Sequence, residues 1–165
     1  MNLDEKIISA LKDLDYEEAT EIQKKAIPIA LKRRDILAAA QSGTGKTAAF
    51  LLPILAELLE TKQTKTILRT LILVPTRELA SQISKAVEDF SKYMDISSLA
   101  MVGGVSTKDQ EKKIAKGIDI LVATSGRLME HLKNGTVDLS SVTTVVIDEV
   151  DTMLDMGFLE DIEKI

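Results

Sequence analysis

The stretch that decides the fold is Ala40-Gln41-Ser42-Gly43-Thr44-Gly45-Lys46-Thr47. It follows a short apolar run, residues 35–40, and precedes a run with helical spacing, residues 46–59, so we expect a buried strand, a loop and a helix. Glycines let the backbone of such a loop curl until several N–H groups point at one phosphate. The following helix adds the positive end of its dipole. This context predicts a phosphate-binding loop, although Ala40 stands where the usual pattern begins with glycine.

The residues of this loop have different expected roles. The backbone N–H groups expected around the phosphate oxygens belong to Ser42, Gly43, Thr44 and Gly45. Lys46 is expected to pair with the β- and γ-phosphates of ATP, and the Thr47 hydroxyl to ligate Mg²⁺. The competing interpretation is a glycine-rich turn with no ligand, which the combination of strand, loop and helix disfavours.

A second signal is the apolar run Val145-Val146-Ile147, which ends in the acidic residues Asp148, Glu149 and Asp151. Asp148 is expected to hold Mg²⁺ through water, because this ion gives up its hydration shell reluctantly. Glu149 is expected to orient or deprotonate an attacking water. Alone, such a cluster is more often a solvated helix cap. Its presence in one chain with a phosphate loop favours a catalytic role.

The rest of the chain alternates between apolar runs and helical spacing. Strands are expected at residues 35–40, 70–74, 98–102, 118–123 and 143–148, and helices at 3–14, 20–31, 46–59, 77–93, 108–115 and 126–132. Continuous apolar strands between helices predict an α/β fold whose mainly parallel sheet has helices on both faces. Ligands of such folds bind at the carboxyl ends of the strands. The single histidine, His131, is expected on an exposed helix face.

Composition bounds the function only loosely. The 165 residues fit one soluble domain with an aliphatic core, since 45% are hydrophobic and only 3% aromatic. The absence of cysteine excludes disulfides and is compatible with the cytoplasm, where we expect the protein. No apolar run is long enough to span a bilayer, and the first residues do not resemble a signal peptide. The net charge of −5 argues against bulk coating of nucleic acid but permits a local phosphate-binding strip.

Taken in order, the motifs of the chain resemble those of DEAD-box RNA helicases. The motifs are Ala40 to Thr47, Pro75-Thr76-Arg77-Glu78-Leu79, Gly103-Gly104, Thr124-Ser125-Gly126-Arg127 and Asp148-Glu149-Val150-Asp151. Upstream, Tyr16, Gln23 and residues 26–28 resemble the Q motif of that family. The resemblance covers essentially the whole chain and implies a RecA-like domain with a P-loop. It departs from the family pattern at Val150, Ser125 and Ala19, where alanine, proline and proline are usual.

The resemblance also implies roles for residues that pattern alone leaves open. Tyr16 would stack on adenine, and the Gln23 amide would donate to and accept from the adenine edge. Without the family, Tyr16 would be an aromatic residue at a helix end and Gln23 a solvated one. The implied RNA-binding residues are Pro75, Thr76, Arg77, Gly104, Thr124 and Arg127. Without the family, residues 75–79 would be a strand-to-helix turn with Arg77 paired with an acid, Gly103-Gly104 an ordinary turn, and residues 124–127 the capped start of a helix.

The family has a second RecA-like domain that contributes arginines to the ATP site. The Ser-Ala-Thr motif and that second domain are absent from this sequence, so we expect residues 1–165 to form a first RecA-like domain that is incomplete at its C-terminal end. The implied function is ATP-dependent RNA unwinding or remodelling, with ATP and Mg²⁺ as cofactors, and the chain alone is expected to bind nucleotide without efficient turnover. Two alternatives stay open: a DNA translocase core, and a non-catalytic, nucleotide-dependent RNA-binding module.

Overall fold

The computed structural model describes residues 3–41, 43–61 and 66–165. The chain divides into two compact units. The first contains residues 1–63 and 86–95, and the second contains residues 64–85 and 96–165. Helix α4 (Arg77–Phe90) belongs to both, because the division falls within it.

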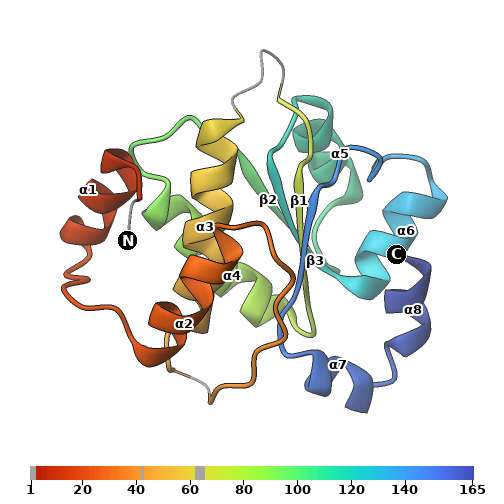
Figure 1. Ribbon diagram of the computed structural model, residues 1–165. Coiled ribbons are helices and arrows are strands. Elements are labelled where there is room, and N and C mark those ends of the chain that lie inside the picture. The colour runs from red at the N-terminus through yellow and green to blue at the C-terminus, as the bar shows by residue number, and fades with distance from the viewer. Residues whose placement is uncertain (1–2, 42, 62–65) are drawn as a thin grey trace. The chain divides into compact units, whose positions relative to one another are not determined.

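The second unit is built on a parallel sheet. Its strands are β1 (Thr70–Val74), β2 (Ser98–Met101), β3 (Ile120–Thr124) and β4 (Thr144–Ile147), in the order β2-β3-β1-β4 (Figure 1). Every residue of β1 is buried, as are the first four of β3. Strands of this kind read as continuous apolar runs because both of their faces are covered. The α/β class and the parallel sheet expected from the sequence are confirmed.

The register brings the carboxyl ends of the four strands to one edge of the sheet. The pairs nearest that edge are Val74 with Thr124, Leu73 with Ile147, and Met101 with Ala123. The segments that follow the strands therefore leave the sheet at the same edge. These segments are residues 75–79, 102–107, 125–127 and 148–151, which include the motifs singled out in the sequence.

The helices of the second unit lie between and after the strands. They are α5 (Thr107–Ala115), α6 (Ser125–Lys133), α7 (Val150–Asp155) and α8 (Leu159–Lys164). The sequence predicted the first two to within a residue or two and missed the last two. Six residues make fewer than two helical turns, so α7 and α8 are too short for a periodic pattern to identify them.

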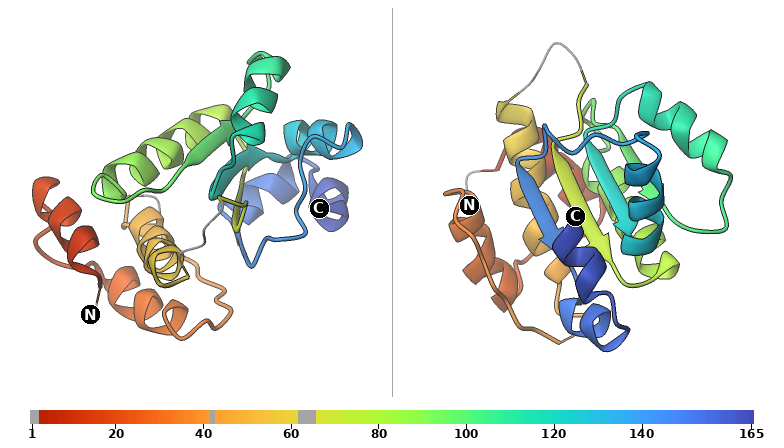
Figure 2. Two further views of the ribbon diagram at one scale, coloured as in Figure 1. Left: turned by 90° about the horizontal axis from the view of Figure 1, so that it is seen from above. Right: turned by 90° about the vertical axis from the view of Figure 1, so that its right-hand side faces the viewer.

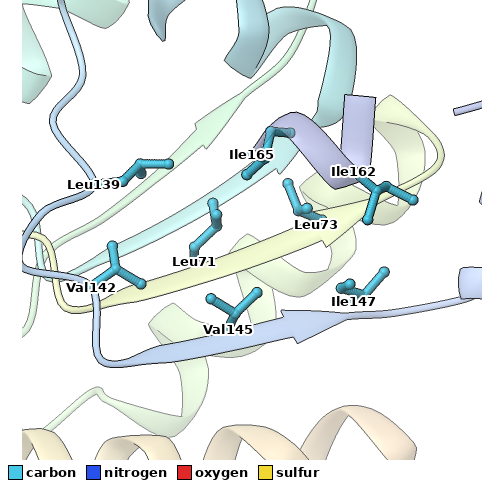
Figure 3. Close-up of a pocket in the computed structure, with 8 residues that line it drawn as sticks. All are labelled: Leu71, Leu73, Leu139, Val142, Val145, Ile147, Ile162 and Ile165. Carbon is cyan, nitrogen blue, oxygen red and sulfur yellow. The ribbon is translucent and has the colours of Figure 1, made fainter. Parts of the chain in front are cut away.

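An apolar groove lies over β1 and β4 in this unit. Leu71 and Leu73 of β1 lie beside Val145 and Ile147 of β4 on one face of the sheet (Figure 3). The other side chains that line the groove are Leu139, Val142, Ile162 and Ile165. Val145 remains 55% exposed, because β4 is an edge strand of this sheet. The sequence predicted a buried strand here, and the pattern of alternating exposure along β4 differs from that expectation.

The first unit is helical. Helices α1 (Glu5–Asp13) and α2 (Glu21–Ala30) precede α3 (Lys46–Glu60), and α2 packs beside α3 (Figure 2). The core of this unit is aliphatic, with Ile7, Ile27, Leu51 and Leu55 almost fully buried. Among the described residues, none of the helices in either unit combines the length and apolar content needed to cross a bilayer.

The strand expected at residues 35–40 is wrong. This segment is irregular, and Leu37 is 96% exposed. A strand exists only where a neighbouring strand accepts and donates its backbone hydrogen bonds. Within the described part of the chain, the sheet consists of β1 to β4 and does not include this segment. An apolar run therefore identified strand-forming residues but not the partner that a strand requires.

Candidate nucleotide and phosphate sites

The phosphate loop of the first unit has the backbone that the sequence predicts. Gly43 and Gly45 both have positive φ angles, +78° and +90°, which side chains with a Cβ rarely adopt. Gly45 is the N-cap of α3, so Lys46 is the first residue of that helix. A Cβ atom on Gly45 would also collide with Nε2 of Gln23. The left-handed backbone therefore favours glycine at this position, and any other residue would also displace the Gln23 amide. Ser42 lies outside the described residues.

Lys46 folds back over the loop from the start of α3. Its Nζ donates a hydrogen bond of 2.8 Å to the carbonyl oxygen of Ala40, and the Thr44 hydroxyl donates one of 2.7 Å to Gln41. An ammonium group has three N–H donors, so two more are available to an anion beside the loop. Thr47 follows in the first turn of α3 and is partly exposed. The loop thus combines a lysine, a hydroxyl and the positive end of a helix.

Gln23 connects the start of α2 to this loop. Its side-chain oxygen accepts from the Thr20 N–H at 3.0 Å, and its Nε2 donates to the Gly45 carbonyl at 3.1 Å. The residue is buried, where pattern alone favoured a solvated glutamine. An amide has a second donor and a second acceptor beyond these two bonds. Recognition of adenine by Gln23 stays a prediction, and the structure adds a direct bond from this residue to the phosphate loop.

Tyr16 follows α1 and packs against the last residue of α4. Its ring meets Phe90 edge to face, with centroids 5.5 Å apart, and the residue is 46% exposed. Nearby, Asp13 accepts hydrogen bonds from Lys92 and Tyr93, which in that order lower the pKa of its carboxyl group. These bonds fasten the end of α1 to the end of α4. A half-exposed ring on a fixed support is suited to stacking on a planar base.

Asp148 and Glu149 lie at the carboxyl end of β4. The Asp148 N–H donates to the Leu73 carbonyl at 3.0 Å and so continues the pairing of β4 with β1. The Asp148 carboxylate accepts from the Glu149 N–H at 3.0 Å. Glu149 has a φ of +52°, which is uncommon for a residue other than glycine and is often found at functional sites. Both side chains are partly exposed.

The donor types fit Mg²⁺, although no protein cage for a metal is formed. Across residues 3–41, 43–61 and 66–165, no three histidine, cysteine, aspartate or glutamate side chains come together to hold an ion. Mg²⁺ prefers oxygen ligands, keeps several waters and is commonly held by one or two protein groups together with substrate phosphates. A threonine hydroxyl, Thr47, and a carboxylate, Asp148, are ligands of that kind. Thr47 belongs to the first unit and Asp148 to the second.

The start of α4 offers a second place for phosphate, at the carboxyl end of β1. The Thr76 hydroxyl caps the helix by accepting from the Leu79 N–H at 3.2 Å. Arg77 is exposed and donates from Nη1 to the Gly103 carbonyl at 2.8 Å, so the alternative of an arginine paired with an acid receives no support from this bond. Gly104 has a φ of +78°, and a Cβ there would collide with Arg77. Pro75 is buried.

Arg127, at the start of α6, is enclosed by protein acceptors. Its guanidinium donates to Gln110, Glu130, the Val105 carbonyl and the Thr107 hydroxyl, and the side chain is only 9% exposed. Thr124, which precedes α6 as its N-cap, is partly exposed. Contact of Thr124 and Arg127 with RNA stays a prediction. The geometry shows that Arg127 fastens the segment after β2 to α6.

The expectation that His131 is exposed is wrong. The residue is fully buried, with Nε2 3.0 Å from Gln110 and Nδ1 2.8 Å from the Thr136 hydroxyl. Burial, and then the charge of Arg127, lowers the pKa of His131. Sequence reasoning missed both His131 and Gln110. The available signal was spacing: His131 is three residues after the buried Leu128 and so shares its helical face.

The chain matches the family model of the DEAD/DEAH box helicases over residues 20–165. It is 44% identical, over its whole length, to a probable ATP-dependent RNA helicase, ddx27, of Dictyostelium discoideum, and 48% identical, over 96% of its length, to the ATP-dependent RNA helicase DeaD of Escherichia coli K12. It spans 21% and 25% of those proteins. The chain is also similar to a crystal structure of a hypothetical ATP-dependent RNA helicase from Sulfolobus tokodaii, with 39% identity and a TM-score of 0.88. The match covers 99% of this chain and 46% of the chain in that crystal structure.

Proposed function

Because this chain belongs to the DEAD/DEAH box helicase family, we propose that it is the ATP-binding domain of an ATP-dependent RNA helicase. The observation that carries the proposal is the loop before α3. Two glycines with positive φ angles lead into a helix whose first residue, Lys46, lies against the loop. That arrangement combines backbone donors, a cation and a helix dipole, which supports binding of nucleotide phosphates at this loop.

In this proposal, the first unit recognises the nucleotide. The backbone of residues 43–45 surrounds the phosphates, and Lys46 turns from the Ala40 carbonyl toward the β- and γ-phosphates. Tyr16 stacks on the adenine and Gln23 hydrogen-bonds its edge. Because Gln23 also bonds to Gly45, binding of the base and the shape of the phosphate loop depend on the same side chain.

For hydrolysis, Thr47 and Asp148 would hold Mg²⁺, which when bound neutralises charge on the phosphates. Glu149 would accept a proton from the attacking water or orient it. Further positive donors are needed as charge develops on the transferred phosphoryl group. By family resemblance, they come from arginines of a second RecA-like domain, so the chain alone would bind nucleotide with little turnover.

We place RNA at the edge of the sheet where Thr76, Gly104 and Thr124 lie. Helix N-termini and backbone N–H groups bind phosphate, and contacts to the backbone carry little sequence information. Contact with 2′-hydroxyl groups would distinguish RNA from DNA. RNA that stimulates hydrolysis better than DNA of the same sequence would support this assignment over a DNA translocase.

The experiment that tests the proposal measures RNA-stimulated ATP hydrolysis by residues 1–165, alone and joined to a second RecA-like domain. We expect negligible turnover by the chain alone and an increase of about 10³ to 10⁵ in the joined protein, the range that a catalytic arginine supplies. Glu149→Gln should cancel the increase while ATP still binds. The matched control is Glu163→Gln, an exposed carboxylate on α8. Steady, RNA-stimulated hydrolysis by the chain alone that disappears with Glu149→Gln would contradict the placement of the missing charge.

A further inference from the structure

The segment from the end of β2 to the first residue of α5, residues 102–107, is held from two sides by arginines. We call it the Gly103 loop. Arg77, from α4, donates to the carbonyl of Gly103. Arg127, from α6, donates to the Val105 carbonyl at 3.0 Å and to the Thr107 hydroxyl at 2.7 Å. The loop therefore depends on two helices that follow other strands of the same sheet.

Apolar packing contributes little to the order of this loop. Val102 is buried where the loop leaves the sheet, but Val105 is 48% exposed, and Gly104 and Ser106 are exposed as well. Gly103 and Gly104 have no side chain to pack. A segment with few buried apolar contacts keeps one conformation only if its polar contacts hold it there. The hydrogen bonds to the loop are accordingly the main source of its order.

Gln110 lies at the centre of these bonds. It is 2% exposed, on α5, and uses both ends of its amide. Its oxygen accepts from Arg127 Nε at 3.0 Å and meets His131 Nε2 at 3.0 Å, and its Nε2 donates to the Val102 carbonyl at 3.1 Å. One side chain thus fixes the start of the Gly103 loop and the arginine that holds its end.

Arg127 and Val102 fix the orientation of the Gln110 amide, because Arg127 Nε can only donate and the Val102 carbonyl can only accept. Because the amide oxygen of Gln110 can only accept, His131 must carry its proton on Nε2. Nδ1 of the ring meets the Thr136 hydroxyl, so both ring nitrogens have partners. A buried ring with two partners cannot turn without breaking them. The amide of Gln110 is therefore held with its oxygen toward Arg127 and its nitrogen toward Val102.

We propose that Gln110, held by Arg127, Val102 and His131, is a positioning residue that holds the Gly103 loop in the shape that binds nucleic-acid phosphate. This inference rests on the proposed function, since it takes RNA to be the ligand of that loop. It also gives Arg127 a specific role: its guanidinium acts on RNA binding by shaping the loop through Val105 and Thr107. Within this loop, the part that touches RNA is then the backbone of Gly103 and Gly104.

The test compares three variants of the 1–165 chain. Gln110→Met keeps the volume of the side chain and removes all three hydrogen bonds. Gln110→Glu keeps the two acceptor bonds and loses only the donor to Val102. Gln82→Met makes the same chemical change as the first variant at an exposed position of α4, and is the matched control.

Three measurements separate positioning from general loss of structure. Backbone order parameters of residues 103–107 report on the loop without RNA, the affinity for a single-stranded oligouridylate reports on RNA binding, and the affinity for ADP reports on the first unit. For Gln110→Met we expect order parameters to fall from about 0.85 toward 0.6 and RNA affinity to fall about 10-fold, which corresponds to 1.4 kcal/mol. ADP affinity should not change. Gln110→Glu, which keeps the bonds from Arg127 and His131 but turns an oxygen toward the Val102 carbonyl, should recover part of the RNA affinity, and Gln82→Met should match the wild type.

Other outcomes would contradict either the positioning role of Gln110 or the proposed binding of RNA. Unchanged order parameters in Gln110→Met would overturn the positioning role, as would a disordered loop that binds RNA with full affinity. A parallel loss of ADP and RNA affinity would mean that Gln110 serves only the stability of the whole chain. If the wild-type chain does not bind oligouridylate at all while the loop still loses order in Gln110→Met, the proposed RNA function fails and only the structural role of Gln110 survives.

Discussion

Replacing Gly45 by alanine tests the geometry of the phosphate loop. Gly45 has a φ of +90°, and a left-handed backbone costs a residue with a Cβ about 1 to 2 kcal/mol. The new methyl group would also displace Gln23, whose Nε2 donates to the Gly45 carbonyl, and losing that bond costs about 1 kcal/mol more. We therefore expect Gly45→Ala to lower the free energy of unfolding by about 2 to 3 kcal/mol.

The assay is urea unfolding followed by circular dichroism, in which stability changes appear as a shift of the midpoint at constant slope. Gly135→Ala is the matched control, because Gly135 also has a positive φ, +67°, but its Cβ would meet nothing within 4 Å. It should lose only the backbone part, about 1 to 2 kcal/mol. In a Gln23→Ala background, the cost of Gly45→Ala should fall toward that of this control, since the obstructing amide is gone and only the Thr20 hydroxyl, 3.1 Å from the new Cβ, still crowds it.

Equal losses of unfolding free energy in Gly45→Ala and Gly135→Ala, each made in the wild-type background, would contradict this expectation. That result would mean that the Gln23 amide moves aside freely and does not hold the loop. The alanine variant should also bind ADP more weakly, because the displaced Gln23 and the strained turn both belong to the proposed nucleotide site.

Two further predictions concern Gln23 and His131. Gln23→Ala should weaken ADP binding by about 1 to 2 kcal/mol, from lost hydrogen bonds to the base; equal calorimetric affinities of the wild type for ADP and GDP would exclude adenine recognition. His131 has a lowered pKa in the folded chain, from burial first and then Arg127, with Glu130 and Glu111 acting in the opposite direction. Below a pH of about 6.5, the ordinary pKa of histidine, His131 binds a proton in the unfolded chain but not in the folded one. The free energy of unfolding should therefore fall as the pH is lowered through about 6.5, by at most about 1.4 kcal/mol per pH unit. It should level off below the folded pKa. Unfolding between pH 7 and 5 should show this loss in the wild type and not in His131→Gln; identical profiles would contradict it.

Local signals in the sequence predicted much of the fold. The strand at residues 70–74 agrees with β1, and the helix expected from Lys46 begins at that residue in α3. Both predictions agree with the structure because a continuous apolar run and a glycine-rich turn each restrict the backbone without help from distant residues. The positive φ angles of Gly43 and Gly45 follow from the same local chemistry.

Features that depend on distant partners were not predicted. Residues 35–40 have strand-forming side chains, but pairing is a property of the neighbouring strand and not of the run itself. Gln110 lies on a helix rich in charged residues, and its hydrogen bonds to Arg127, His131 and Val102 join it to segments that are distant in the sequence. Roles in binding adenine and RNA came from family resemblance and roles in binding Mg²⁺ from the loop and acidic motifs, and all of them stay predictions until they are measured.

The most direct test of the account is a calorimetric titration of the 1–165 chain with ADP in the presence of Mg²⁺. The central claim is that the loop before α3 binds the phosphates of a nucleotide and that Lys46 pairs with them. We expect Lys46→Ala to lose about 1.5 to 3 kcal/mol, roughly 10- to 150-fold in affinity, while circular dichroism stays normal. Lys32→Ala, which removes an exposed lysine of the same unit, should bind as the wild type does. An unchanged affinity in Lys46→Ala would contradict the account.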